Sequence, residues 1–380
     1  MSRGDSMLKK ALGFFLVIAL LSGCTKPQTL TKFSNQTIEA GFDTIITLIG
    51  YTKDKAEFDA YFEIMKSEFT RLNELFDKYN DYEGVNNIKT INDNAGVAPV
   101  VVDQAILDML KLAKEWYEPS GGSFNVTMGS VLEIWHEYRD MGQADNSDGK
   151  PGDVPPLHLL EEANVCTGWQ FIEIDESAKT VYINNACSSL DVGGIAKGYA
   201  TEIVARLLVD EGLSAGIVNA GGNVRLINTK PDGAKWAVGI QSPDIENTSE
   251  SLDTLYADKS MSVVTSGDYQ RYYIGPDDVV YHHLIDPSTL YPARQARSVT
   301  ILIEDSGLAD TLAKPLFILP YDQALAFLEK FNADHPDVFM GAVWVYDKGM
   351  QPVGTQAIDV GEFSLVHSEN IKPFSRLYNE

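Results

Sequence analysis

Strand-like and helix-like segments follow one another irregularly along this chain, and this order limits the fold more than any other feature. Short β-branched or alternating segments predict strands at Thr44–Tyr51, Phe171–Ile174, Thr180–Ile183, Gly216–Asn219, Asn223–Ile227, Trp236–Ile240, Val279–Ile285, Val299–Glu304 and Ala342–Asp347. Apolar residues at helical spacing predict helices over Lys53–Tyr79, Gln104–Trp116, Ile195–Leu213, Leu308–Leu319 and Asp322–Phe331. Strands outnumber helices and do not alternate strictly with them, which favours an α+β fold with an antiparallel sheet over a doubly wound one.

The first two dozen residues predict a secretion signal that is not part of the fold. Lys9 and Lys10 precede a short apolar run over residues 11–20, which is too short to span a bilayer as an ordinary helix. The following Leu-Ser-Gly-Cys24 resembles the lipobox of bacterial lipoproteins, in which the cysteine is lipidated and becomes the first residue. The alternative is an ordinary signal peptide with an incidental cysteine.

The lipobox predicts a chain in three parts. We expect a signal peptide over residues 1–23, a polar membrane tether over 24–36 and a single domain over 37–380, anchored at the extracytoplasmic face of the bacterial cell membrane. Hydrophobic residues form 44% of the chain, enough for a packed core. The segment rich in Asp, Gly and Pro from Asp145 to Pro156 predicts a surface loop.

The net charge of the chain is −24, and this excludes one class of partner. Residues 1–23 hold three basic residues and one acidic residue, so the remainder holds 27 basic and 53 acidic residues and carries −26. Nucleic-acid binding needs a basic footprint, which is absent from the sequence. A phosphate ligand would need metal ions, helix N-termini or local lysines to offset the acidic charge.

Two cysteines remain once Cys24 is assigned to the lipid. Cys166 and Cys187 lack the spacing of metal ligands, and two cysteines alone do not determine their pairing. A disulfide and two free thiols both stay open.

A glycine pair precedes the helix predicted from Ile195. Glycines let the backbone approach a ligand closely, and a helix N-terminus with Lys197 in its first turn favours an anion. The run is Asp191-Val192-Gly193-Gly194-Ile195-Ala196-Lys197-Gly198-Tyr199-Ala200, which is neither a Walker A loop nor a dinucleotide fingerprint. A helix start with glycines for packing is the alternative.

Three further segments carry weaker signals. The run Asn-Ala-Gly-Gly-Asn over residues 219–223 predicts a turn between two strands. His282 and His283 are neighbours on a predicted strand, so we expect one to face a site and the other to face solvent. Asp310 lies near a predicted helix start and is either an N-terminal helix charge or a ligand for a hard metal ion.

The order of the segments is more specific than any one of them. The motifs, in order, are Phe124-Asn125-Val126-Thr127-Met128-Gly129, the runs at 191–200 and 219–223, Thr265-Ser266-Gly267-Asp268-Tyr269, His283-Leu284-Ile285-Asp286-Pro287 and Ala309-Asp310. Together they resemble the ApbE family of FAD:protein FMN transferases over about Phe42 to Leu319. The resemblance implies a single T-fold-like α+β domain, FAD as donor substrate and Mg²⁺ as the metal. It also implies transfer of FMN to a Thr or Ser hydroxyl, with AMP leaving.

The resemblance implies roles for individual residues as well. Contacts to FAD and its flavin fall on Phe42, Tyr79, Ser123, Phe124, Asn125, Asp191, Lys197 and Ile285. The catalytic positions are His283, a base for the acceptor hydroxyl or a partner of the phosphate, and Asp310, the metal-binding carboxylate. The carbonyl of Gly194 falls on a second metal ligand. Lys314 stands where the family commonly has a threonine near the metal, so its ammonium either replaces a cation beside the pyrophosphate or turns away.

The acceptor implied by the resemblance is a flavoprotein subunit of a membrane redox complex or an extracytoplasmic reductase. Two other functions suit an anchored extracytoplasmic protein. A solute-binding lipoprotein would need no metal carboxylate and would release its ligand unchanged. A flavin carrier or FAD-hydrolysing relative would have the same pocket but no protein acceptor.

Overall fold

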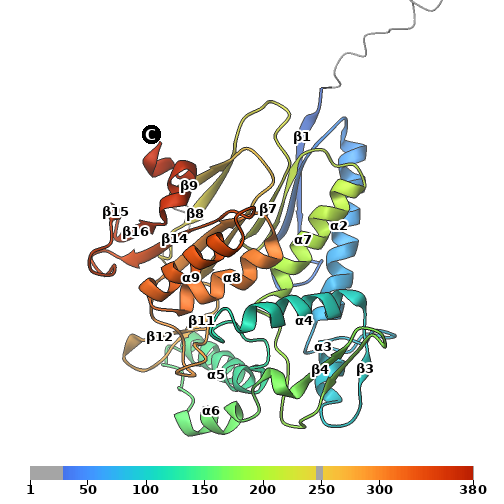
Figure 1. The fold of residues 1–380 in the computed structure, drawn as a ribbon, viewed down its shortest axis with the longest axis vertical. Helices are drawn as coiled ribbons and strands as arrows, with labels where there is room; N and C mark the ends of the chain where they lie inside the picture. Colours follow the sequence, from blue (N-terminus) through green and yellow to red (C-terminus); the bar gives the residue numbers. More distant parts are fainter. Residues whose placement is uncertain (1–28, 245–250, 380) are drawn as a thin grey trace, which may run out of the picture.

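A nine-stranded sheet forms the centre of the molecule (Figure 1). The computed structural model describes residues 29–244 and 251–379, so the predicted signal peptide and Cys24 lie outside the described residues. All neighbouring strands of this sheet pair antiparallel, which confirms the predicted antiparallel α+β class. In spatial order the strands are β1 (Thr31–Thr37), β2 (Ile46–Thr52), β6 (Gly216–Ala220), β7 (Asn223–Ile227), β10 (Ser262–Gly267), β13 (Ser298–Ile303), β14 (Met340–Asp347), β16 (Phe363–His367) and β15 (Ala357–Val360).

Four helices cover one face of the sheet. They are α2 (Lys55–Phe76), α7 (Ala196–Asp210), α8 (Ser306–Ile318) and α9 (Tyr321–Asp334). The helix α2 starts where the Asp54 side chain accepts the backbone N–H of Glu57. Its buried face is made by the apolar residues that predicted a helix, among them Phe58, Met65 and Leu72. The largest hydrophobic core therefore lies between these helices and the sheet.

The opposite face of the sheet is covered by a second, smaller layer. The hairpin of β8 (Trp236–Gln241) and β9 (Ser251–Ala257) packs there with the C-terminal 3₁₀ segments Glu369–Phe374 and Arg376–Tyr378. The fully buried Asp253 joins them, because its carboxylate contacts His367 Nε2 at 3.0 Å and accepts the hydroxyl of Ser375 at 2.6 Å.

The remaining elements lie below the sheet in Figure 1. The helices are α3 (Ile88–Asp93), α4 (Gln104–Tyr117), α5 (Gly129–Ser147) and α6 (Leu157–Asn164). A three-stranded sheet is formed by β3 (Val100–Val101), β5 (Thr180–Ile183) and β4 (Ile172–Asp175). A two-stranded sheet is formed by β11 (Tyr272–Ile274) and β12 (Val280–His282).

The structure corrects several boundaries. Residues 31–36 of the predicted tether belong to β1, whose seven residues pair with β2, so a tether must end before Thr31. The predicted surface loop begins too early, because α5 continues to Ser147. The strand predicted over residues 279–285 is reduced to β12. Within the described part of the chain, no helix has the length and apolarity that a membrane span requires.

Candidate functional site

A cavity of about 810 Å³ opens between the end of α2, the segment before α7, α5 and α8. Its volume lies in the range of small-molecule sites. Every residue given a flavin, metal or catalytic role by the sequence lines it: Phe42, Tyr79, Ser123, Phe124, Asn125, Asp191, Gly194, Lys197, His283, Ile285, Asp310 and Lys314. The fold thus brings together residues that lie up to 272 positions apart in the sequence.

The segment Asp191–Gly194 is held by hydrogen bonds from its backbone N–H groups before it enters α7. The N–H of Asp191 donates to the Val126 carbonyl at 2.8 Å, and the N–H of Gly193 donates to Asp191 Oδ1 at 2.9 Å. Helix α7 begins after Ile195 with no side-chain cap. Gly194, Ala196 and Lys197 line the cavity, so the first turn of α7 faces it, and a helix N-terminus favours an anion.

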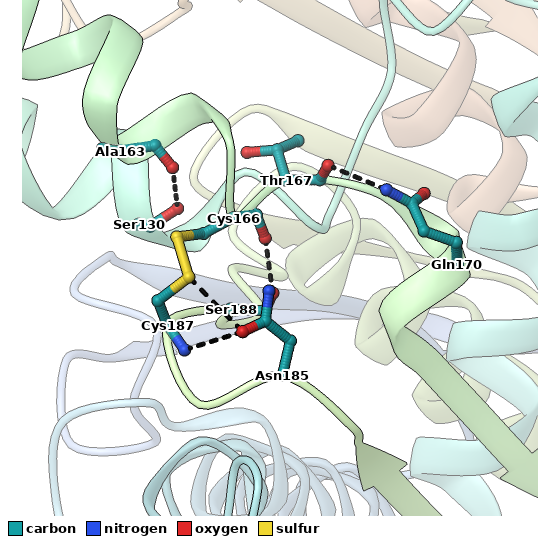
Figure 2. Close-up of a disulfide and its surroundings, with 8 residues drawn as sticks. All are labelled: Ser130, Ala163, Cys166, Thr167, Gln170, Asn185, Cys187 and Ser188. Atoms are coloured by element: carbon teal, nitrogen blue, oxygen red, sulfur yellow. Dashed lines mark hydrogen bonds between the residues drawn. A yellow bond between two sulfur atoms is a disulfide. The ribbon is translucent and has the colours of Figure 1, made fainter.

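A disulfide joins Cys166 to Cys187 and settles the pairing that the sequence left open. Figure 2 shows the bond beside Ser188, whose hydroxyl donates to the Cys166 carbonyl at 2.5 Å. Because Cys187 stands four residues before Asp191, the bond ties the segment leading into the cavity to the end of α6.

Asp310 joins α8 to α7. Its Oδ2 accepts the N–H of Gly198 at 2.8 Å, and its Oδ1 accepts the ammonium of Lys314 one turn further along α8. The expectation that Asp310 stands at the helix start was wrong, because Asp305 caps α8 and Asp310 lies in the second turn. A Cβ at Gly198 would lie 2.3 Å from the Asp310 Cβ and 2.4 Å from the Ser306 carbonyl oxygen, so glycine is required for this close approach.

Lys197 crosses from α7 to the turn between β6 and β7. Its Nζ donates to the Gly221 carbonyl at 3.1 Å. Burial lowers the pKa of Lys197 to about 8, with Asp310 raising it and the cations of Arg271 and Lys314 lowering it. The segment 219–223 is the predicted turn, and both Gly221 and Gly222 have positive φ.

The two adjacent histidines have different surroundings, and only in part as predicted. His283 lines the cavity, whereas His282 does not face solvent: the residue is 3% exposed and its ring packs edge-on against Phe317. His282 Nε2 lies 2.7 Å from the Ala293 carbonyl, and its Nδ1 accepts the N–H of Leu284. These contacts place the proton of His282 on Nε2 and give it a structural role.

His283 carries a free ring nitrogen. Its Nδ1 is buried with no hydrogen-bond partner among the described residues. Burial, the His282 ring and the cations of Arg271, Lys314 and Lys197 hold the pKa of His283 well below its usual range. The imidazole is therefore neutral at neutral pH and retains a nitrogen that can accept a proton.

A polar cluster around Asp191 was missed by sequence reasoning. Lys78 Nζ lies 2.8 Å from Asp191 Oδ2, and His136 Nε2 lies 3.8 Å from the same oxygen. Burial would raise the pKa of Asp191, but Lys78 and His136 lower it below its usual range. The Tyr79 hydroxyl lies 3.0 Å from His136 Nδ1, at the rim of the cavity. Lys78 precedes Tyr79, a predicted flavin contact, so the sequence could have indicated that Lys78 lies near the site. His136 lies on α5, a helix that the sequence did not predict.

The remaining predicted flavin contacts are positioned by packing and by local hydrogen bonds. Phe124 is buried, and its ring lies 3.5 Å from where a Cβ on Gly194 would stand. Asn125 Oδ1 accepts the N–H and the hydroxyl of Thr127, which shapes the turn. Phe42 has φ of +59°, and its N–H donates to Asn73 Oδ1 at 2.8 Å.

The donor set for a metal ion is small. Among the described residues, no group of three or more His, Cys, Asp or Glu side chains is arranged to hold a metal. The predicted ligand Asp310 is already paired with Lys314.

Comparisons with known proteins identify relatives of this chain. The ApbE family model matches residues 42–339. The FAD:protein FMN transferase of Treponema pallidum is 33% identical over 258 residues, covering 64% of this chain and 68% of that protein. The protein of that name from Vibrio cholerae is 26% identical over 314 residues, covering 82% and 88%. The crystal structure of the ApbE protein from Thermotoga maritima is 28% identical with a TM-score of 0.72, covering 91% of this chain and 100% of that one.

Proposed function

Since the chain belongs to the ApbE family, we propose that it is an FAD:protein FMN transferase. Its relatives from Treponema pallidum and Vibrio cholerae bear this name. The observation that carries the proposal is the convergence of all twelve predicted residues on one cavity. Aromatic side chains line this cavity, which suits a flavin ring, and the cations Lys197, Arg271 and Lys314 also line it, which suits a diphosphate.

The proposed reaction is attack of an acceptor Thr or Ser hydroxyl on the phosphorus of the FMN half of FAD. A new P–O bond forms to the hydroxyl oxygen, the P–O bond of the diphosphate bridge breaks, and AMP leaves with the bridging oxygen. The hydroxyl proton passes to the neutral imidazole of His283, which lines the cavity. The low pKa of this imidazole would rise when an anionic diphosphate binds beside it, because a nearby negative charge favours the protonated form.

Other residues hold the substrate in place. Lys197 begins in the first turn of α7 and holds its ammonium beside Gly221 in the wall of the cavity, and the N-terminus of α7 also favours negative charge. Lys78 keeps Asp191 ionised and held in place, so the Asp191 carboxylate can accept hydrogen bonds from a bound flavin or ribose. Positioning and charge neutralisation are the main contributions a protein makes to phosphoryl-type transfer.

The resemblance implies Mg²⁺, held by Asp310 and the Gly194 carbonyl. The residues present do not fit this arrangement well, because both oxygens of Asp310 accept hydrogen bonds from Gly198 and Lys314. Magnesium normally takes one or two carboxylates in near-octahedral geometry. We therefore assign no step of the reaction to a metal ion.

The acceptor we propose is an extracytoplasmic flavoprotein subunit, reached by an enzyme that is lipid-anchored at Cys24. The disulfide between Cys166 and Cys187 supports this compartment, since disulfides persist mainly outside the cytosol. The short apolar leader ending at Cys24 supports the anchor.

One incubation tests the proposal: purified protein, FAD, Mg²⁺ and a candidate acceptor, followed by a denaturing gel read for flavin fluorescence. Fluorescence on the acceptor, lost when its Thr or Ser is changed to Ala, is expected. Release of free FMN without labelling of any acceptor would indicate an FAD hydrolase, and recovery of unchanged FAD would indicate a carrier. Calorimetry should also show tighter binding of FAD than of FMN or riboflavin, because the diphosphate and AMP half add contacts.

A further inference from the structure

One end of the cavity, which we call the phosphate end, is lined by five ionisable residues: Lys197, Arg271, His283, Asp310 and Lys314. Lys197 and His283 each interact electrostatically with Arg271 and Lys314, so these groups share one region of the cavity. Lys197, Arg271 and Lys314 are cations, and Asp310 is the carboxylate among them. The phosphate end therefore carries excess positive charge although the chain as a whole is strongly acidic.

Lys314 is a fixed part of this end. It stands four residues after Asp310 on α8, the spacing at which helix side chains meet, and the two side chains are 12% and 5% exposed. Its Cε lies 3.6 Å from the position of a Cβ on Gly194, so the aliphatic stem packs along the loop before α7. The ammonium is thus held between the predicted metal ligands Gly194 and Asp310.

A metal ion at Asp310 would compete with this ammonium. The Oδ2 of Asp310 is committed to the N–H of Gly198, and Oδ1 is committed to Lys314. Two cations within a few ångströms of one another in a partly buried site repel strongly. Either the ammonium leaves or the metal does not bind.

We propose that the Lys314 ammonium binds the FAD diphosphate in this chain in place of a metal cation, and that FAD binds here without a metal ion at Asp310. The inference rests on the proposed function, because it takes FAD as the donor. A lysine on a rigid helix turn supplies the charge that a diphosphate needs in an acidic protein, and its three N–H donors can bridge Asp310 and a phosphate oxygen.

The test is calorimetry of FAD binding to chelator-treated full-length protein, with EDTA or Mg²⁺ present. Wild type should bind FAD with the same affinity, within about twofold, in both conditions. Lys314→Met should lose about tenfold or more in EDTA, because a charge-assisted contact is lost, and Mg²⁺ should restore part of the affinity. Titration of Mg²⁺ alone should give binding heat in Lys314→Met that wild type lacks.

A matched control is available on α2. Lys55 and Asp59 form a pair with the same spacing in solvent, so Lys55→Met should leave FAD affinity unchanged in both conditions. Lys314→Arg retains the charge and should bind FAD in EDTA, which covers a failure of Lys314→Met to fold.

Wild-type protein that binds FAD only when Mg²⁺ is present overturns the inference, as does a folded Lys314→Met that binds FAD in EDTA as wild type does. Failure of the proposed function would look different: FAD would bind normally, and no acceptor would be labelled.

Discussion

Removing the disulfide between Cys166 and Cys187 is expected to destabilise the folded protein by about 3 kcal/mol. The two cysteines are separated by 21 positions. The chain-entropy relation for a loop of that length gives about 3 kcal/mol at room temperature, because the cross-link restricts the unfolded chain. The variant Cys166→Ser with Cys187→Ser removes the cross-link and leaves no free thiol from this pair.

Equilibrium unfolding in urea, followed by tryptophan fluorescence without flavin, measures this change. The urea midpoint should fall in the double variant. The slope of the unfolding free energy against urea concentration should rise, because an unfolded chain without the cross-link is less restricted and exposes more surface. A reductant should lower the wild-type midpoint to that of the variant and should leave the variant unchanged, which serves as the internal control.

The effect should reach the cavity as well. Ser188 adjoins Cys187 and contacts the Cys166 carbonyl, and Asp191 follows three residues later. Loosening this segment should weaken FAD binding in the double variant, measured under conditions where it is fully folded. Equal midpoints for wild type and variant, with no response of wild type to reductant, would refute the cross-link and the loop-entropy reasoning together.

Three further changes have defined outcomes. Gly198→Ala should weaken FAD binding sharply, because its Cβ would collide with Asp310 and force α7 from α8. Gly307→Ala should weaken it less in the same titration, because its Cβ would meet the Asp305 and Tyr199 side chains at the longer distance of 3.2 Å. Asp253→Asn should cost about 1–3 kcal/mol in urea unfolding at neutral pH. Burial would raise the pKa of Asp253, but hydrogen bonds from His367 and Ser375 lower it overall. The ionised carboxylate therefore stabilises the fold fully above about pH 4, and this stabilisation declines as the pH falls through the folded-state pKa. A stability difference between the variant and wild type that grows in acid would contradict this. Cys24→Ala should move the protein from the membrane fraction to soluble or uncleaved precursor, and an unchanged fraction without lipid on the N-terminal peptide would argue against the anchor.

Elements with a strong local pattern could be predicted from the sequence. The apolar spacing of α2 identified its buried face, and the helix at Gln104 was placed to within a residue, because these patterns depend on which side of one element faces the core. By contrast, α5 has few buried residues for its length and was not predicted. The polar strand β1 was assigned to a tether, because its structure comes from pairing with β2 and not from its own apolar pattern.

The order of motifs was also legible in the sequence, and it alone indicated the ApbE family and the residues that line the cavity. Only the tertiary structure decided how those residues are paired. Two contacts join separate segments of the chain: the bond between Cys166 and Cys187, and the ion pair of Lys78 with Asp191. A local sequence pattern cannot predict which separate segments come into contact. His282 appeared free to face solvent because strand alternation specifies opposite sides but not what covers each side; the Phe317 ring of α8 covers it. The direction of the Lys314 side chain was left open for the same reason. The sequence shows that Lys314 stands four residues after Asp310, but only the packing of α8 against the loop at Gly194 places its ammonium in the cavity.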